Sequence, residues 1–390
     1  MDCSTTAHFC SVIPCLHWKR KGRTPMNKRI AMLTTVHPHD DVRIYHKMAK
    51  TLAQAGWRVE IYNPRMESTG EYGIRFCRLI LPGGRAMRML RARLIAREAV
   101  MSSRADLVML HDPELLPLLR TLQLAGRKTI YDAHEDLPLQ LLGKEWIPAP
   151  MRPAAARLGE TLLRRCLVYA DGVIAATAPI AARLGENAVL VRNRVTEEDF
   201  QRFETALHRY RPIPRAVCYA GALTERRGLS RMIRCCCRAG AILLLAGEFE
   251  SEGLRRRVQQ MEEYRCVRYF GPLDREGLAG LYAQANAGLL LLDGTEAYRE
   301  SEPVKSFEYL CAGLPVIASD FSHWRAILPE EWVSFVPEQD EEAVTAAIRQ
   351  ALSQNQRGRM TGRREELYDR YGFFEDAARL IECCERIGRG

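Results

Sequence analysis

The 390-residue chain lacks any long apolar run. Its longest aliphatic stretches, Ala241 to Ala246 and Leu289 to Leu292, are far shorter than the ~20 residues needed to cross a bilayer. Hydrophobic residues make up 47% and charged residues 27% of the chain, which is close to the globular average and excludes disorder as its main character. At roughly 100–200 residues per domain, we expect two globular domains and no membrane span.

The sequence also lacks the patterns of secreted and zinc-binding proteins. Its 13 cysteines are odd in number, cluster at 235–237 and 383–384, and show no CxxC pair. Near the start, a short apolar run precedes the basic residues 19–23, which is the reverse of the order in a secretory signal. We therefore expect reduced thiols in the cytosol, and we interpret residues 1–25 as an extension outside the fold.

Positive charge is concentrated in the first half of a chain whose formal net charge is +9. Residues 1–200 carry 30 Lys and Arg against 20 Asp and Glu, whereas residues 201–390 carry 27 against 28. This asymmetry indicates an anionic partner for the first half, either a phosphate-bearing ligand or a membrane surface. No motif interleaves aromatic and basic residues, so we expect no nucleic-acid partner.

From Arg29 onward, short apolar runs alternate with segments of helical periodicity, which predicts parallel strands joined by helices. The expected strands are 30–33, 58–62, 107–110, 128–131, 172–176 and 189–191, then 216–220, 241–246, 267–270, 287–292 and 315–318. The polar segment 194–208 and two nearby prolines interrupt this rhythm and indicate the domain linker. We expect an α/β fold with two doubly wound Rossmann-like domains, 26–205 and 206–371, facing across a cleft. Ligands of such domains bind beyond the carboxyl ends of the strands.

Three strand ends of the first domain carry histidine beside carboxylates. The loop from His37 to Arg43 includes Asp41, His111 precedes Asp112, and His134 follows the fourth expected strand. Histidine can position a hydroxyl, steady developing positive charge or relay a proton. Capping of the next helix by an aspartate of the loop, and metal binding, are the alternatives. The absence of His-x3-His spacing counts against a metal.

In the second domain, the first strand leads through Gly221 to Arg226 and Arg227, just before a helix expected to begin near Leu229. Glycine permits close backbone approach, and two arginines at a helix start can clamp a diphosphate. A solvated arginine pair is the alternative.

The next two strands end at Gly247 and Glu248, and at Gly271. These tight exits leave room for a base or ribose against the backbone, although ordinary turns look the same.

The most informative segment runs from Glu300 to Ala318. Pro303 suits a first helical turn and Gly313 a C-terminal cap, which predicts a helix from about Pro303 to Ala312. Its positive end, with Lys305, would point into the cleft. Glu300 and Glu308 would flank this helix start, where carboxylates can accept the paired hydroxyls of a ribose or a sugar ring.

At these residues the sequence resembles retaining glycosyltransferases of family 4, which have the GT-B architecture. The resemblance runs from about Lys28 to the C-terminus, and the loop from His37 to Arg43 resembles that of a subgroup of bacterial envelope-polysaccharide enzymes. It is most specific over Pro303 to Ala318, and Glu300 and Glu308 reproduce the family's Glu-x7-Glu spacing. It departs from the family at Ala222, where a basic residue is usual.

The resemblance implies a role for each site residue. Glu308 would bind the donor ribose and Glu300 would lie near the donor sugar, with Glu302 as a competitor for the latter role. Arg227 and Lys305 would hold the diphosphate, and His134 would lie near the C6 hydroxyl of the sugar. Residues 372–390 would form a helix that returns to brace the first domain.

The resemblance further implies transfer of a sugar from a UDP- or GDP-sugar with retention of configuration, by a front-face mechanism, with no cofactor and no metal. The acceptor would be a cell-envelope glycan or a polyprenyl-diphosphate-linked glycan. Residues 85–104 carry six arginines and one glutamate among apolar side chains, which suits an anionic membrane surface or a lipid-diphosphate. A solvated basic helix is the alternative.

We therefore expect a cytoplasmic glycosyltransferase that is peripheral on the inner face of the cytoplasmic membrane. Two other functions stay open at the level of sequence. One is a nucleotide-sugar epimerase, which would need no acceptor and no membrane, and the basic first domain argues against it. The other is a non-catalytic scaffold, which Ala222 makes credible.

Overall fold

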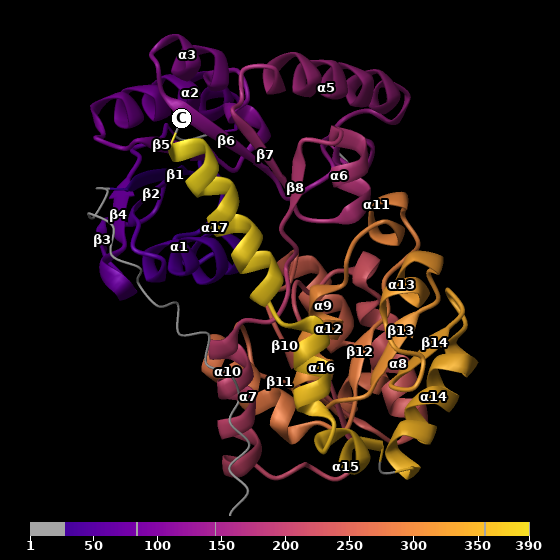
Figure 1. Ribbon diagram of the computed structural model, residues 1–390. Helices are drawn as coiled ribbons and strands as arrows, with labels where there is room; N and C mark the ends of the chain where they lie inside the picture. Colours follow the sequence, from indigo (N-terminus) through magenta and orange to yellow (C-terminus); the bar gives the residue numbers. More distant parts are fainter. Residues whose placement is uncertain (1–27, 83–84, 145, 355, 390) are drawn as a thin grey trace, which may run out of the picture.

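The computed structural model describes residues 28–82, 85–144, 146–354 and 356–389. The expected extension 1–25 lies outside the described residues. Within them the chain forms two α/β bodies, each built on its own sheet, as the sequence predicted (Figure 1).

The sheet of the first domain has eight strands in the order β3-β4-β2-β1-β5-β6-β7-β8. All its pairings are parallel except that of β3 with β4. The strands are β1 (Arg29–Leu33), β2 (Arg58–Asn63), β3 (Ser68–Thr69), β4 (Arg75–Arg78), β5 (Leu107–Leu110), β6 (Lys128–Ala133), β7 (Gly172–Ala175) and β8 (Ala188–Leu190).

Helices cover both faces of this sheet. The helices of the first domain are η1 (Val42–Ala49, a π-helix), α1 (Lys50–Gln54), α2 (Arg85–Ser102), α3 (Leu118–Leu124), α4 (Leu137–Leu142), α5 (Arg152–Leu167), α6 (Ala178–Leu184) and the last helix of the chain, α17 (Phe374–Gly388), with short 3₁₀ turns η2 (Glu71–Gly73), η3 (Pro113–Leu115) and η4 (Ala149–Met151). One core packs η1, α1 and α17 on the sheet, and the other packs α2, α3 and α5. The C-terminal residues therefore return to the first domain.

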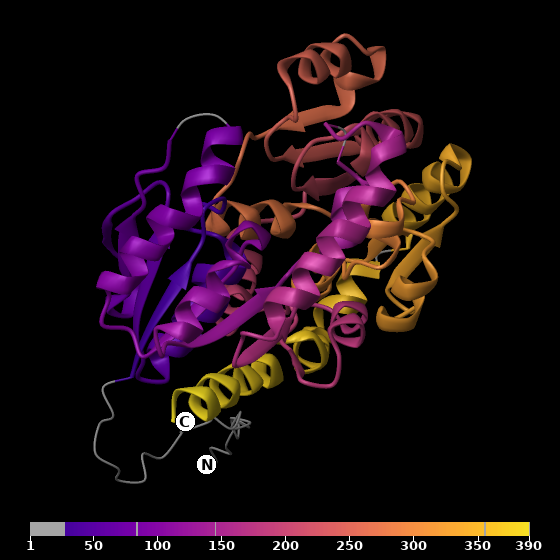
Figure 2. The ribbon, with the colours of Figure 1, turned by 90° about the horizontal axis from the view of Figure 1, so that it is seen from above.

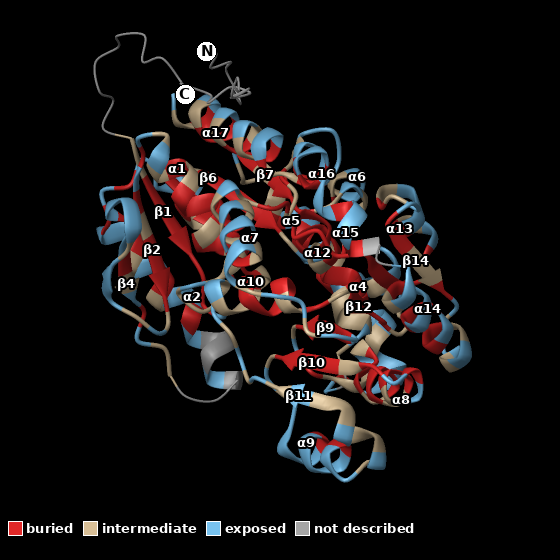
Figure 3. Cartoon of the chain, turned by 90° about the horizontal axis from the view of Figure 1, so that it is seen from below, coloured by how far each residue is buried: buried red, intermediate tan, exposed pale blue. Residues whose placement is uncertain are grey.

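The second sheet has six parallel strands in the order β11-β10-β9-β12-β13-β14. This is the 3-2-1-4-5-6 order of a Rossmann fold. The strands are β9 (Ala216–Ala220), β10 (Ile242–Ala246), β11 (Val267–Tyr269), β12 (Gly288–Leu290), β13 (Val316–Ser319) and β14 (Val333–Val336). Seen by burial, the central strands of both sheets form the buried core of each domain (Figure 3).

The helices of the second domain again lie on both faces of the sheet. They are α7 (Glu197–Arg209), η5 (Glu225–Arg227), α8 (Leu229–Ala239), α9 (Glu252–Gln259), η6 (Glu262–Cys266), α10 (Arg275–Gln284), α11 (Glu296–Arg299), α12 (Val304–Cys311), α13 (Ser322–Ile327), α14 (Glu341–Ser353), α15 (Gln356–Thr361) and α16 (Arg364–Tyr371).

The region expected to be a plain linker contains α7. Its side chains Phe203 and Ala206 are buried in the core of the second domain. Thr196 caps the helix and three acidic residues occupy its first turn, so the polar composition reflects an amphipathic helix rather than a loop.

Two further findings concern the cysteines and the apolarity of the helices. Every cysteine among the described residues is a free thiol. Among the helices of the described part of the chain, none combines the length and apolarity needed to cross a membrane.

Candidate functional site

A cleft of about 630 Å³ lies between the two domains. The first domain contributes α4 and the segments after β6 and β7, and the second contributes η5, α11 and the residues just after it. The lining side chains that carry charge or an imidazole are His134, Glu135, Asp136, Lys144, Arg152, Arg226, Arg227, Glu296 and Glu300. In projection from above, α5 of the first domain extends over the second (Figure 2).

The predicted helix at the cleft is α12, and its bounds agree with the sequence prediction to within one residue. Pro303 is its N-terminal cap, and Tyr309 fixes its position against the sheet. The Tyr309 hydroxyl accepts a hydrogen bond from the amide of Ala220 at 3.3 Å, and its ring packs on Gly288 of β12. A Cβ at Gly288 would overlap that ring, so the missing side chain allows α12 to lie close to the strands.

Glu300 and Glu302 occupy different surroundings despite their proximity in the chain. Glu300 is exposed and lines the cleft. Glu302 is half-buried and one of its carboxylate oxygens has no hydrogen-bond partner. Burial raises the pKa of Glu302, although Arg194 opposes that rise. Of the two, only Glu300 is available to a ligand in the cleft.

Arg227 lies at the base of the cleft beside the glycine turn that follows β9. A Cβ at Gly221 would come 3.5 Å from its guanidinium, and its Cζ lies 5.9 Å from the centre of the Tyr298 ring. Burial opposes the charged form, but nearby Tyr219 and Tyr298 raise the pKa of Arg227. The guanidinium is therefore a permanent positive charge facing the cleft. Arg226 instead donates to the carbonyl of Gly143 in the first domain at 3.4 Å.

The three glycine turns of the second domain support one another. The amide of Gly221 donates to Ala246, and that of Gly247 to Gly271 at 2.8 Å. Gly247 has φ +136°, and a Cβ there would overlap the Gly221 carbonyl. Position 247 therefore requires glycine because the two turns pack closely against each other. The neighbouring side chain of Glu248 is exposed.

Lys305 and Glu308 pair with each other rather than opening onto this cleft. Lys305 Nζ lies 2.8 Å from Glu308 Oε2, and neither residue is among the lining residues. Glu308 is 3% exposed. It also accepts from Tyr282 at 2.8 Å and Arg275 at 3.0 Å. Although burial opposes ionisation, Lys305 and Arg275 hold the pKa of Glu308 well below its usual range.

In the first domain, His134 lines the cleft and touches His37. Their Nε2 atoms are 3.1 Å apart, so one ring must donate to the other. Burial lowers the pKa of His134. Burial also opposes charge on His37, but its hydrogen bond to Asp41 and the nearby Asp112 raise the pKa of His37. We therefore assign the donating proton to His37 and the accepting nitrogen to His134.

Asp41 has two roles at the start of η1. It caps that helix by accepting from the amides of Arg43 and Ile44, and it accepts from His37 Nδ1 at 3.2 Å. Despite burial, these bonds lower the pKa of Asp41 to about 2. The capping that the sequence offered as an alternative is thus present, and the same carboxylate also holds His37.

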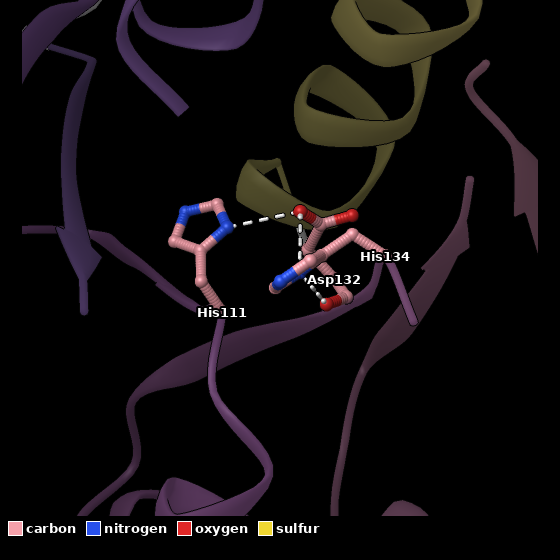
Figure 4. Close-up of side chains that lie close together, drawn as sticks. All are labelled: His111, Asp132 and His134. Carbon is pink, nitrogen blue, oxygen red and sulfur yellow. Dashed lines mark hydrogen bonds and ion pairs between the residues drawn. The ribbon is translucent and has the colours of Figure 1, made fainter. Parts of the chain in front are cut away.

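Beneath the two histidines lies the buried carboxylate of Asp132. Arg43 contacts both of its oxygens, at 2.6 and 2.9 Å, and His111 Nδ1 lies 2.9 Å from one of them. Figure 4 shows the rings of His111 and His134 next to the carboxylate of Asp132. Burial opposes ionisation, but Arg43 and His111 hold the pKa of Asp132 far below its usual range.

The ligand atoms of His111, Asp132 and His134 lie within 4.8 Å of one another, which is close enough for a metal ion. However, Arg43 already occupies the carboxylate and supplies its counter-charge. A cation here would have to displace that guanidinium, so the donor set fits a metal poorly.

Arg43, His111 and Asp112 are buried rather than open to an acceptor. Asp112 accepts from the amide of Thr35 at 2.6 Å and lies 3.4 Å from His37. The sequence predicted that these three side chains lie in loops at the cleft. In the structure they are buried behind His37 and His134 and help to hold the two rings in place.

Lys47, which the sequence analysis did not single out, also belongs to this region. It is 2% exposed on η1, and its side-chain nitrogen has no ion-pair or hydrogen-bond partner among the described residues. Burial lowers the pKa of Lys47 to about 7, against the pull of Glu308. No sequence signal marks Lys47, because its burial depends on how the two domains meet.

Comparison with known proteins agrees with this two-part construction. Residues 42–197 match the model of the glycosyl transferase 4-like domain, and residues 214–354 match that of the glycosyl transferases group 1. No curated protein sequence matches the chain.

Solved structures with the same fold cover nearly the whole chain. Sucrose-phosphate synthase from Thermosynechococcus elongatus is 18% identical with a TM-score of 0.70, covering 92% of this chain and 98% of its own. WaaG, a glycosyltransferase involved in lipopolysaccharide biosynthesis, is 15% identical with a TM-score of 0.67, covering 93% and 100%. Anabaena HepE in complex with UDP is 11% identical with a TM-score of 0.63, covering 92% and 100%.

The two matched models fall on the two sheet domains, and the interdomain cleft lies where their residues meet. With its two parallel-sheet domains in the arrangement of these neighbours, the chain belongs to the GT-B glycosyltransferases.

Proposed function

We propose that this glycosyltransferase moves a sugar from a UDP- or GDP-sugar, with retention of configuration, to a cell-envelope glycan or a polyprenyl-diphosphate-linked glycan. The observation that carries the proposal is the composition of the cleft. Arg227 and Glu300 of the second domain face His134 of the first across one cavity. A permanent cation, a free carboxylate and a neutral imidazole are what a diphosphate, a sugar ring and an acceptor hydroxyl require.

The donor would bind on the second domain. Arg227 would contact the diphosphate, the turns at Gly221, Gly247 and Gly271 would lie along the nucleoside, and Glu308 would bind the ribose. HepE, which shares the fold, was solved with UDP and with UDP and glucose. Since Lys305 and Arg275 occupy Glu308, ribose binding would require one of these contacts to open.

Retention follows in this proposal from a front-face reaction. The bond from the sugar to the diphosphate breaks while the acceptor oxygen approaches from the same side. The acceptor proton passes to the leaving diphosphate, and Arg227 stabilises the charge that builds there. Closure of the domains would exclude water and suppress hydrolysis. These steps need no metal.

The acceptor would enter from the first domain, where Lys144 and Arg152 line the cleft. Both side chains suit the phosphate groups of a lipid-linked acceptor. We accordingly propose that the protein acts in the cytoplasm, at the inner face of the membrane that carries such an acceptor.

The first experiment is a thermal-shift screen of the full chain against UDP, GDP, ADP and CMP and their sugars. A ligand that binds the folded state raises its stability. We expect one nucleotide family to raise Tm, and Arg227→Gln to reduce that rise. Arg256→Gln, on the exposed side of α9, is the matched control. If no nucleotide shifts Tm, the donor assignment is wrong.

The second experiment tests transfer itself. With the donor identified, NMR of the product from a soluble acceptor analogue would show an anomeric configuration equal to that of the donor sugar. An inverted product would overturn the front-face proposal. Donor binding without transfer to any acceptor would favour the scaffold alternative.

A further inference from the structure

Helix α5 carries an apolar stripe on its solvent side. Met151, the N-terminal cap of α5, is 61% exposed, and Leu158 and Leu162 within the helix are 71% and 42% exposed. Their spacing of seven and four residues places them on one face of the helix. Val168, just past the helix end, is 71% exposed. Exposed apolar side chains gathered in this way mark a contact surface rather than ordinary solvent exposure.

Beside this stripe lies a second cavity, which we call the arginine cleft. It measures about 860 Å³ and lies between α2, α3 and the C-terminal end of α5. Its charged lining side chains are all arginines: Arg93, Arg97, Arg120 and Arg165. Among the described residues none of the four has an ion-pair partner. Arg120 is held over the Tyr169 ring, 5.8 Å from its centre.

Four unpaired guanidinium groups around one cavity favour an anionic occupant. Arginine binds phosphate in particular, because its planar fork donates two parallel hydrogen bonds. Exposed Leu94 lies between two of these arginines on α2. Phosphate-binding and apolar side chains therefore share a single surface, made by α2, α3 and α5.

Figure 1 shows α2, α3 and α5 at the end of the first domain that is farther from the body of the second domain. One end of α5 reaches the sugar-transfer cleft through Arg152, and the other end reaches the arginine cleft through Arg165. A helix of this length spans about 24 Å. The apolar stripe thus connects the two cavities.

We propose that the surface made by α2, α3 and α5 binds an anionic phospholipid bilayer, with lipid phosphates in the arginine cleft and the α5 stripe at the boundary of headgroups and acyl chains. Interfacial binding of this kind combines buried apolar area with attraction to anionic lipid. A protein partner or second copy of the chain would have to supply carboxylates to the same arginines. The inference extends the proposed function, since it places the cleft beside a membrane-borne acceptor.

The test is cosedimentation of the full chain with vesicles, without donor or acceptor. We expect binding to phosphatidylglycerol-containing vesicles at low salt, little binding to pure phosphatidylcholine, and loss of binding at ~0.5 M salt. The double variant Arg97→Gln/Arg165→Gln should bind at least about tenfold more weakly. Leu158→Gln/Leu162→Gln should weaken binding while keeping its salt dependence.

The matched control is Arg255→Gln/Arg256→Gln, which removes the same charge from exposed positions of α9. Equal loss in the control would show a general charge effect and overturn the assigned surface. No binding to anionic vesicles at low salt would overturn the membrane as the occupant. Because all substituted side chains are exposed, unchanged circular dichroism and Tm should accompany each variant.

Vesicle binding and sugar transfer fail separately. Transfer to a soluble acceptor without vesicle binding would refute this inference and leave the proposed function standing. Vesicle binding without sugar transfer would refute the proposed function and leave this inference standing.

Discussion

At the scale of single residues, the two glutamates before α12 show how position decides role. Glu300 is exposed in the cleft, whereas Glu302 faces the buried Arg194. We predict that Glu300→Gln lowers kcat by about 100-fold, since it removes a charge from the reacting sugar. Glu302→Gln should leave kcat within a few-fold of the parent. Steady-state assays with the identified donor measure both, and equal losses would contradict the assignment of Glu300.

Lys47 leads to a prediction about stability and pH. Its folded pKa of about 7 lies below the ordinary 10.5, so the unfolded chain binds more protons between these values. Burying Lys47 therefore destabilises the fold, and that cost shrinks as pH rises from 7 toward 10.5. Lys47→Met should be more stable than the parent, and its advantage should fall by at most roughly 1.4 kcal/mol per pH unit in this window.

Urea unfolding at pH 7 and pH 9 measures the stability difference between Lys47→Met and the parent. The control is Lys28→Met, at a position that is ion-paired and half-buried. An advantage of Lys47→Met that stays constant between the two pH values would show that Lys47 does not titrate as described.

At the scale of elements, the strands expected from apolar runs all form. The structure adds β3, β4 and β14, which the sequence analysis missed because they are short or lie at the sheet edges. The π-helical form of η1 was not predictable either. It begins at the capping residue Asp41, and the same turn places Arg43 against Asp132, a contact between residues far apart in the chain.

The packing of α12 on β12 can be tested at Gly288. A side chain there would overlap the Tyr309 ring, which is held in turn by Ala220. Gly288→Ala should lower the free energy of unfolding by about 1–3 kcal/mol, as overpacking does. Gly253→Ala on α9 is the control, because a Cβ there meets only the Ser251 side chain at 3.8 Å. If chemical denaturation shows both variants equally stable, α12 does not depend on this contact.

At the scale of the whole molecule, helix α17 belongs to the first domain although it follows the second domain in sequence. Helix α17 packs in the core of the first domain, and Asp376 accepts from the Arg192 amide at 2.9 Å. We predict that Leu380→Ala, at a fully buried position, costs about 2–5 kcal/mol. Nucleotide binding should persist below the new unfolding midpoint, since the donor site is assigned to the other domain. Loss of that binding under conditions where the variant is folded would contradict this division.

The sequence by itself determined the fold class and the elements that meet at the cleft. Apolar runs and glycine or proline at their ends are local signals. They place Gly221, Arg227 and His134 after the carboxyl ends of strands and Glu300 before the helix expected at the cleft. Because parallel strands end at one edge of a sheet, these residues could be expected near one site.

Only the tertiary structure decided which of the candidates face a ligand. It buried Arg43, His111 and Asp112 beneath the histidines, and it paired Lys305 with Glu308. It also gathered arginines from three helices around one cavity. Whether a side chain is buried or ion-paired depends on segments that are distant in sequence. A local sequence pattern does not indicate which distant side chain will pair with it or shield it from water.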